Sequence, residues 1–371
     1  MTSGENRGRD AESGKLCEGR KGARRLTARR ISAGKINQMD VDEEVCLPRL
    51  SRVAVCGGTH GNELSGVYLV RELLKLQRRP SEDDDEEPTS LLTVLSNPRA
   101  IQQGRRYTDT DLNRCFTLAT LNGPTSDSPP YEILRARELN AMLGPKGGPG
   151  AVDLVCDLHN TTANMGLCFI AYSDCDWICL HIFKHLQRQM PDAPMRFVHL
   201  GMSEKESYSL DSVGKHGFAM ELGPQPHGVV RSDIYVLMNA GVQHMLDWVH
   251  LFNSGAVFEG GFVDVFTLVK NIDYPRDKMT HNITAAVHSH LQDRDFCLLR
   301  PHDPLFQTFT GETLRYSGSE PLYALFINEG SYYEKGIALT LARKRRLAVP
   351  AIRAQTEEEE QARGFTSEEE E

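Results

Sequence analysis

Residues 52–63 read RVAVCGGTHGNE, an apolar run followed by a glycine-rich turn. In the stretch that follows, apolar residues recur at helical spacing. These residues are Val67, Leu69, Val70, Leu73, Leu74 and Leu76. A strand that passes through a short turn into a helix is the repeating unit of α/β folds. We therefore predict a strand over Arg52–Cys56, a helix over Leu64–Gln77, and a turn between them at one edge of a sheet.

The same alternation continues along the chain. Further apolar runs predict strands over 91–95, 152–158, 167–172 and 218–222, and helical spacing predicts helices over 131–143, 175–189 and 234–252. After residue 255 the pattern changes to short β-type runs at 263–269, 284–287, 322–327 and 337–341. We predict an α/β domain over 46–255, with a mainly parallel sheet flanked by helices, and a smaller β-rich C-terminal domain over 256–350.

Composition narrows the class of protein. The chain has 371 residues, of which 40% are hydrophobic and 25% charged, as expected for a globular protein with a sizeable core. The net charge is −9, but the stretch 357–371 carries −7 of it, which leaves the rest close to neutral. A nucleic-acid binder would carry a basic surface, so we expect no nucleic-acid partner. No apolar run approaches the ~18–20 residues of a membrane-spanning helix.

The two ends differ from the body. Residues 1–45 are polar and lack the apolar segment of a secretion signal, so we predict a disordered extension, within which Met39 is a second plausible start. Residues 351–371 are predicted to be a disordered acidic tail, and the acidic run 82–87 a solvated loop.

The cysteines indicate a reducing compartment. There are nine, an odd number, and no CxxC pair occurs. Buried reduced thiols in a cytosolic protein are the best interpretation. The spacing of Cys175 and Cys179 is compatible with metal binding, but no second pair completes a site.

Two segments carry candidate metal ligands. His60 and Glu63 lie in the first turn, and His159 ends a predicted buried strand. Two histidines and one glutamate are a standard ligand set for catalytic zinc. The carboxyl ends of strands are where sites form in open α/β sheets, and Asp157 is placed to orient a ligand. The alternative is a helix-capping histidine in one segment and a buried structural histidine in the other.

Other polar residues are ambiguous by themselves. Arg106, Asn113 and Arg114 lie in one short loop, where arginines either bind a carboxylate or pair with neighbouring aspartates. Glu221 ends an apolar run, either as a salt-bridged residue or as a general base beside a metal ion. Tyr332 is either a packing aromatic or a site residue.

Together these segments resemble the aspartoacylase family of zinc-carboxypeptidase-like amidohydrolases. The resemblance runs from about residue 52 to about residue 348. It rests on GGTHGNE, NPRA, DLNR, DLHNTTANMG, ELGPQP with GVVRSDI, LQDRDF and FINEGSYYEKG. It implies a zinc-carboxypeptidase-like fold, whose C-terminal domain closes over the site, and one zinc ion per chain held by His60, Glu63 and His159.

The resemblance also implies roles for the ambiguous residues. Asn113 and Arg114 would bind the substrate α-carboxylate, and Arg106 would polarise the scissile carbonyl. Glu221 would serve as general base and then as proton donor. Tyr332 would reach the site from the C-terminal domain and help close over the substrate, which His159 would also contact.

One departure concerns selectivity. Enzymes of this family that act on N-acetylaspartate use a Tyr and an Arg upstream of the general base; without gaps, those positions hold Ser207 and Asp211. An aspartate at this position repels a second substrate carboxylate. If the alignment has a one-residue gap, Tyr208 takes the place of the missing Tyr instead of Ser207. The pattern resembles family members that deacylate N-acyl aromatic amino acids and N-acetylcysteine S-conjugates (mercapturates), which is the activity we expect.

Several alternatives stay open at this point. The chain could act on N-acetylaspartate, cut peptides as a carboxypeptidase, or bind a small ligand without catalysis. Retention of all the ligand candidates and of Glu221 argues against the last of these. The resemblance further implies a cytoplasmic homodimer or homotetramer, and leaves open peripheral association with the apical plasma membrane.

Overall fold

The computed structural model describes residues 44–78, 89–124, 127–203, 205–356 and 358–359. The acidic run 82–87, Met39 and most of both predicted disordered ends lie outside these residues. The prediction of disorder is wrong at two places. Strand β1 (Glu44–Leu47) begins inside the expected extension, and β15 (Ala351–Ala354) lies in the expected tail. They pair with each other in parallel, which a prediction based on composition cannot reveal because the partners are 307 residues apart (Glu44 with Ala351).

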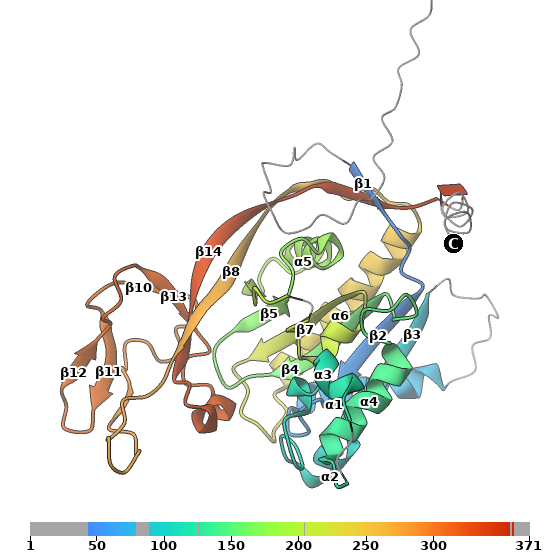
Figure 1. The fold of residues 1–371 in the computed structure, drawn as a ribbon. Coiled ribbons are helices and arrows are strands. Elements are labelled where there is room, and N and C mark those ends of the chain that lie inside the picture. The colour runs from blue at the N-terminus through green and yellow to red at the C-terminus, as the bar shows by residue number, and fades with distance from the viewer. Residues whose placement is uncertain (1–43, 79–88, 125–126, 204, 357, 360–371) are drawn as a thin grey trace, which may run out of the picture. The chain divides into compact units, whose positions relative to one another are not determined.

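A ten-stranded sheet forms the centre of the described chain (Figure 1). Its strands are β2 (Arg52–Gly57), β3 (Ser90–Leu95), β4 (Leu154–Asn160), β5 (Gly166–Ala171), β6 (Met195–His199), β7 (His216–Gly223), β8 (Gly261–Ile272), β10 (Cys297–Leu299), β13 (Leu322–Leu325) and β14 (Leu339–Val349). Their order is β10-β13-β14-β8-β6-β5-β7-β4-β2-β3. Strands β3, β2, β4 and β7 run parallel, as do β5, β6 and β8, and the two groups meet at the antiparallel pair β5–β7. The expected mixed, mainly parallel sheet is confirmed.

Helices cover both faces of this sheet. They are α1 (Leu64–Gln77), α2 (Pro98–Gln103), α3 (Leu118–Asn122), α4 (Tyr131–Leu143), α5 (Trp177–Gln189) and α6 (Ser232–Asn253), with short 3-10 helices η1 (Leu112–Arg114), η2 (Leu210–Val213) and η3 (Gly330–Lys335). Val53 and Val55 of β2 pack in the cluster that contains α1, α5 and α6 residues. Ala54 and Cys56 point the other way, into the cluster that contains α4 residues. Apolar residues on both faces of one strand explain its continuous apolar sequence.

The β-rich part of the chain is built onto the same sheet. Strand β8 pairs with β6, and β14 pairs with β8 along almost its whole length. Figure 1 shows these two long strands passing α5, with β10, β11, β12 and β13 gathered at one end. Strands β9 (Ala285–Val287), β11 (Pro304–Thr308) and β12 (Thr313–Arg315) form a separate three-stranded sheet, which shares an apolar cluster with β10, β13 and β14. The expected smaller β-rich region is therefore present.

Helices α1 and α4 have the predicted bounds, and α5 begins two residues later than predicted. Strand β4 runs over 154–160 rather than 152–158, because buried polar residues continue it beyond the apolar run. Strand β6 and helix α2 were not predicted. Within the described residues, no helix has both the length and the apolar character needed to span a bilayer.

Candidate active site

The three predicted metal ligands meet at one edge of the sheet. His60 and Glu63 lie in the turn between β2 and α1, and His159 lies near the carboxyl end of β4. Because β2 and β4 are neighbouring parallel strands, both segments reach the same edge. Glu221 lies on β7 directly beside His159 in the strand register. The topology therefore brings together residues separated by up to 161 positions in the sequence.

A glycine allows the ligand-bearing turn to pack closely. A Cβ at Gly61 would lie 2.2 Å from the carbonyl carbon of Ala100 and 2.3 Å from the nitrogen of Ile101, both in α2. Asn97 caps this helix, since its side-chain oxygen accepts a hydrogen bond from the backbone N–H of Ala100 at 3.1 Å. The GGTHGNE and NPRA segments thus pack against each other, and this contact fixes the position of His60.

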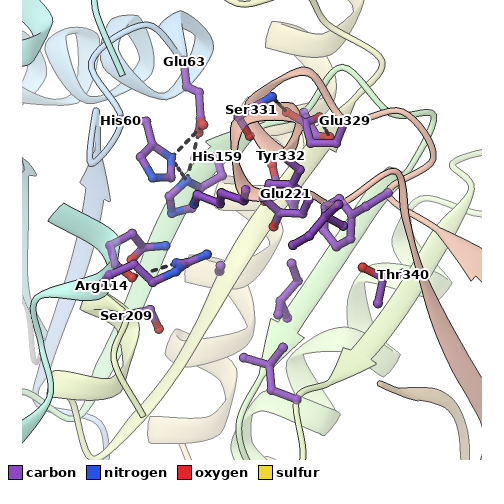
Figure 2. Close-up of a pocket in the computed structure, with 18 of the residues that line it drawn as sticks. His60, Glu63, Arg114, His159, Ser209, Glu221, Glu329, Ser331, Tyr332 and Thr340 are labelled. Carbon is purple, nitrogen blue, oxygen red and sulfur yellow. Dashed lines mark hydrogen bonds and ion pairs between the residues drawn. The ribbon is translucent and has the colours of Figure 1, made fainter. Parts of the chain in front are cut away.

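The candidate ligand atoms point toward one another (Figure 2). His60 Nδ1 lies 2.7 Å from Glu63 Oε1, and His159 Nδ1 lies 2.9 Å from Glu63 Oε2. The two Nδ1 atoms are 3.2 Å apart. All three residues are buried. This is the only such group of metal-ligating side chains within the described residues, and Cys175 and Cys179 are not part of one.

Two aspartates hold the outer nitrogens of the histidines. His159 Nε2 lies 2.8 Å from Asp157 Oδ2, and His60 Nε2 lies 3.0 Å from Asp111 Oδ1. An ionised carboxylate can only accept, so each Nε2 is the donor to its aspartate, and each Nδ1 is the nitrogen that faces Glu63 and would bind a metal ion. Asp157 was predicted from the sequence to orient a ligand. Asp111 was not, because an aspartate among arginines looks like an ordinary ion-pair partner.

This donor set fits a metal ion. Two imidazole lone pairs and a carboxylate converge on one point, and only positive charge stabilises such an arrangement. The pKa values of these side chains reflect the same need for positive charge. Burial raises the pKa of Glu63, but the charges of His60 and His159 outweigh it and hold that pKa well below its usual range. Burial lowers the pKa of His159, but Asp157 and Glu63 raise it well above the usual value.

Arg106 lies beside the ligand cluster. Its Nη1 donates to Glu63 Oε1 at 3.0 Å, and its Nη2 lies 3.7 Å from Asp111 Oδ2. Burial lowers the pKa of the guanidinium, and the nearby carboxylates raise it by more, so Arg106 keeps its charge. Its Nε is buried without a partner among the described protein atoms. A fixed cation next to the ligand cluster is suited to stabilise an oxyanion.

Asn113 and Arg114 line the cavity from η1. The side-chain oxygen of Asn113 accepts from the backbone N–H of Leu210 at 3.1 Å, which turns its NH₂ group into the donor available for a ligand. Arg114 Nη1 donates to the carbonyl of Asn113 at 2.8 Å, and its guanidinium lies over the ring of Tyr208, 4.6 Å from the centroid. Both side chains are held in place by contacts within the protein.

Glu221 lies partly buried in the cavity wall and has an unusual proton affinity. Burial raises its pKa to about 8, with further increases from the charges of Glu63 and Glu329 and partial compensation by His159 and Arg106. A carboxyl group whose pKa lies near the pH of the cell can both accept and release a proton, as general acid–base catalysis requires. Bound metal would add positive charge here and lower this pKa.

The β-rich region contributes Tyr332 to the same cavity. Tyr332 lies in η3, and burial raises the pKa of its hydroxyl. The neighbouring Glu329 accepts from the hydroxyl of Thr162 at 2.9 Å and from the backbone N–H groups of Thr162 and Ser331 at 2.7 and 2.9 Å. These bonds tie η3 to the loop that follows β4, so Tyr332 faces the ligand cluster. Sequence analysis did not identify Glu329, whose only signal was its place in the FINEGSYYEKG motif.

A cavity of about 150 Å³ connects these residues. Figure 2 shows three groups around the cavity, namely the candidate metal ligands, Arg114 and Thr340. Glu221 and Tyr332 lie between these groups. Besides the polar residues, it is lined by Ile170, Leu200, Ala219, Leu268, Phe326 and Ile337. Ile170 and Ala219 are cross-strand partners, and Ala219 shares a face of β7 with Glu221. The sheet therefore supplies an apolar wall next to the polar centre.

Tyr208 and Asp211 both line this cavity, whereas Ser207 is buried and is not among the lining residues. Asp211 is 2% exposed and accepts from Ser209 Oγ at 2.5 Å. Burial raises its pKa to about 6, so the group is mostly ionised at neutral pH. The structure thus brings every predicted site residue to one cavity, and of the two candidates in this segment it is Tyr208 that reaches the cavity.

Two family models match the chain. One is described as the succinylglutamate desuccinylase/aspartoacylase catalytic domain and covers residues 49–249. The other, described as the AstE/AspA barrel-sandwich hybrid domain, covers residues 261–344.

Individual proteins are also similar. A zebrafish (Danio rerio) protein named N-acyl-aromatic-L-amino acid amidohydrolase (carboxylate-forming) B is 57% identical over 311 residues, which is 84% of this chain and 98% of that protein. A human protein of the same name, without the letter, is 48% identical over 83% of this chain and 95% of its own length. The crystal structure of murine aminoacylase 3 aligns with a TM-score of 0.77 at 43% identity, covering 82% of this chain and 99% of that one.

Proposed function

This chain belongs to the succinylglutamate desuccinylase/aspartoacylase family, and we propose that it is a zinc-dependent amidohydrolase of N-acyl aromatic L-amino acids and mercapturates. The reaction releases a carboxylate and the free amino acid. The observation that carries the proposal is the convergence of His60, Glu63 and His159 beside Glu221 in a cavity that also contains Arg114. The names of the similar proteins support the substrate class.

His60, Glu63 and His159 would hold the zinc ion. Zinc in such a set polarises a carbonyl and lowers the pKa of water to about 7. The chain contributes the orientation of the ligands through Asp111 and Asp157, which keep both imidazoles in the tautomer that binds metal.

Asn113 and Arg114 would bind the α-carboxylate of the substrate. The guanidinium of Arg114 presents paired N–H donors to a carboxylate, and the NH₂ group of Asn113 adds another. This anchor would place the scissile amide beside Glu221. Arg106 would donate to the carbonyl oxygen of the amide, where negative charge develops as the carbon becomes tetrahedral.

Glu221 would transfer the proton. Its carboxylate takes a proton from the attacking water as the new C–O bond forms. The same carboxyl group then gives that proton to the amide nitrogen as the C–N bond breaks, so the carboxylate is restored at the end of the cycle. Tyr332 would reduce access of bulk water to the site when substrate is bound.

The cavity wall favours an aromatic side chain over an acidic one. Asp211 carries negative charge at neutral pH and repels a second substrate carboxylate, more strongly in a dry pocket than in water. Burial of an aromatic substrate side chain against Ile170, Leu268 and their neighbours is favourable by ~25 cal/mol per Å² of apolar surface. Aromatic substrates should therefore exceed N-acetylaspartate by ~10²-fold or more in kcat/KM, about 2.7 kcal/mol.

Metal analysis together with a substrate panel tests the proposal. The full chain should contain about one zinc per chain and release acetate from N-acetyl-L-tyrosine and from an N-acetyl-S-aryl-cysteine. His159→Ala should lose both metal and turnover, whereas His290→Ala, at an exposed histidine outside the cavity, should keep both. Full activity of the metal-free chain would contradict the zinc mechanism. Equal rates on N-acetylaspartate would indicate an aspartoacylase instead.

We also propose two domains, 46–255 and 256–350, from the change in sequence pattern, and, from the resemblance alone, a cytoplasmic homodimer or homotetramer. The gap between the two family models, 249 to 261, supports that boundary. Light scattering on the purified chain tests the oligomeric state, and cell fractionation tests cytoplasmic location against peripheral binding to the apical membrane.

A further inference from the structure

Tyr172 follows β5 and lines the cavity, but neither its residue type nor its position marked it as a site residue. Its hydroxyl oxygen accepts from the backbone N–H groups of Tyr208 and Ser209, each at 3.2 Å. Ser209 Oγ lies 2.9 Å from the same oxygen. The Tyr172 ring also meets the Tyr208 ring edge-on, with centroids 5.9 Å apart. One side chain thus holds two successive peptide groups of a loop that has no regular structure of its own.

The segment held by Tyr172, residues 208–211, is in direct contact with the proposed carboxylate anchor. The backbone N–H of Leu210 donates to the side-chain oxygen of Asn113 at 3.1 Å. The Tyr208 ring lies under the guanidinium of Arg114. The carbonyl of Tyr208 also accepts from the backbone N–H of Phe116 at 3.0 Å. The orientations of Asn113 and Arg114 therefore depend on where this segment lies.

The contacts of Tyr172 continue through Ser209 to Asp211. Ser209 has one hydroxyl proton and lies 2.5 Å from Asp211 Oδ1. An ionised carboxylate only accepts, so this proton goes to Asp211. The same Ser209 Oγ also lies within hydrogen-bond distance of the Tyr172 hydroxyl, at 2.9 Å. Ser209 thus links Tyr172 to Asp211.

We propose that Tyr172 is a positioning residue for the substrate α-carboxylate, acting through segment 208–211 on Asn113 and Arg114. The inference rests on the proposed function, because it assigns the carboxylate to these two residues. Tyr172 itself need not touch the substrate. Removal of its hydroxyl leaves two backbone N–H groups without their acceptor, and the segment moves away from the anchor.

The test compares two ligands that differ only at the α-carboxylate. N-acetyl-L-tyrosine and its α-carboxamide are titrated calorimetrically into Glu221→Ala protein, with and without Tyr172→Phe, so that turnover does not interfere. Tyr172→Phe should weaken binding of the carboxylate about tenfold, in line with the loss of buried hydrogen bonds. Binding of the carboxamide should change less than about threefold, since it gains little from Arg114. In the wild-type background, KM should rise with kcat nearly unchanged.

Tyr316→Phe is the matched control, because Tyr316 is a buried tyrosine that does not line the cavity. Equal weakening of both ligands, or no weakening, overturns the proposal. If Tyr172→Phe does not fold, Tyr208→Leu is used instead, because it removes the ring beneath Arg114 in the segment that Tyr172 holds. It should give the same selective loss of carboxylate binding. A non-selective loss in Tyr208→Leu also overturns the proposal. A wild-type chain that neither binds nor hydrolyses N-acetyl-L-tyrosine refutes the proposed function instead.

Discussion

Replacing Glu132 by glutamine should destabilise the loop that carries Arg106 and Arg114. Glu132 lies in the first turn of α4 and is fully buried. One carboxylate oxygen accepts from the backbone N–H of Thr108 at 2.6 Å and from Asn97 Nδ2 at 3.2 Å. The other accepts from the N–H groups of Asp109 and Thr110 at 3.0 and 3.1 Å. The side chain is thus the common acceptor for three successive peptide groups.

The magnitude follows from these four bonds. Glutamine keeps one oxygen and puts an NH₂ group in place of the other, so in either orientation two donors face a donor. A buried donor that has lost its acceptor costs about 1–3 kcal/mol. The substitution should therefore lower the free energy of unfolding by about 2–6 kcal/mol, a large part of the total of about 5–15 kcal/mol. If the loop moves to relieve the conflict, Arg106 and Asn113 move with it, and KM rises.

Urea unfolding gives the change in stability, and steady-state kinetics with N-acetyl-L-tyrosine give the change in KM. Glu138→Gln is the matched control, because Glu138 lies on the same helix with its side chain 62% exposed in an ion pair with Arg135. It should change the free energy of unfolding by no more than about 1 kcal/mol. If Glu132→Gln is as stable as this control and has an unchanged KM, the four hydrogen bonds do not hold the loop.

Three further predictions concern the chemistry, the selectivity and the pH dependence. Glu221→Ala should retain zinc while kcat falls by ~10²–10⁴-fold, and near-normal kcat with zinc bound would remove Glu221 from the mechanism. Asp211→Asn should narrow the preference for N-acetyl-L-tyrosine over N-acetylaspartate about tenfold by removing a like charge, measured as a ratio of kcat/KM values; an unchanged ratio would show that the charge of Asp211 does not act on the substrate. Burial lowers the pKa of His181 to about 4, so the unfolded chain takes up this proton first, and stability is lost as the pH falls from about 6.5 towards 4. His181→Gln should reduce that loss by up to about 2 kcal/mol between pH 7 and pH 5 in urea unfolding, and identical pH dependence of the two proteins would exclude His181 as its source.

Much of the site was predictable because its elements are local. The apolar spacing over Leu64–Gln77 and the stop signal after Leu143 predicted α1 and α4 with their observed bounds. His60 and Glu63 lie in a turn between two recognisable elements, and His159 lies at the end of an apolar run. Parallel strands place such segments at one edge, so residue type and position in the chain were enough to select the ligand trio.

The residues that hold this candidate trio and the proposed substrate anchor could not be found in this way. Asp111 contacts His60 across 51 positions, and Tyr172 reaches the N–H of Tyr208 across 36. Glu132 binds the backbone of Thr108 across 24 positions. A side chain that bonds to peptide groups of a distant loop leaves no periodic pattern in either segment, because every residue except proline offers the same N–H. The sequence by itself determined which residues can do the chemistry; the tertiary structure alone decided which buried carboxylates and hydroxyls orient them, since that depends on where loops meet in space.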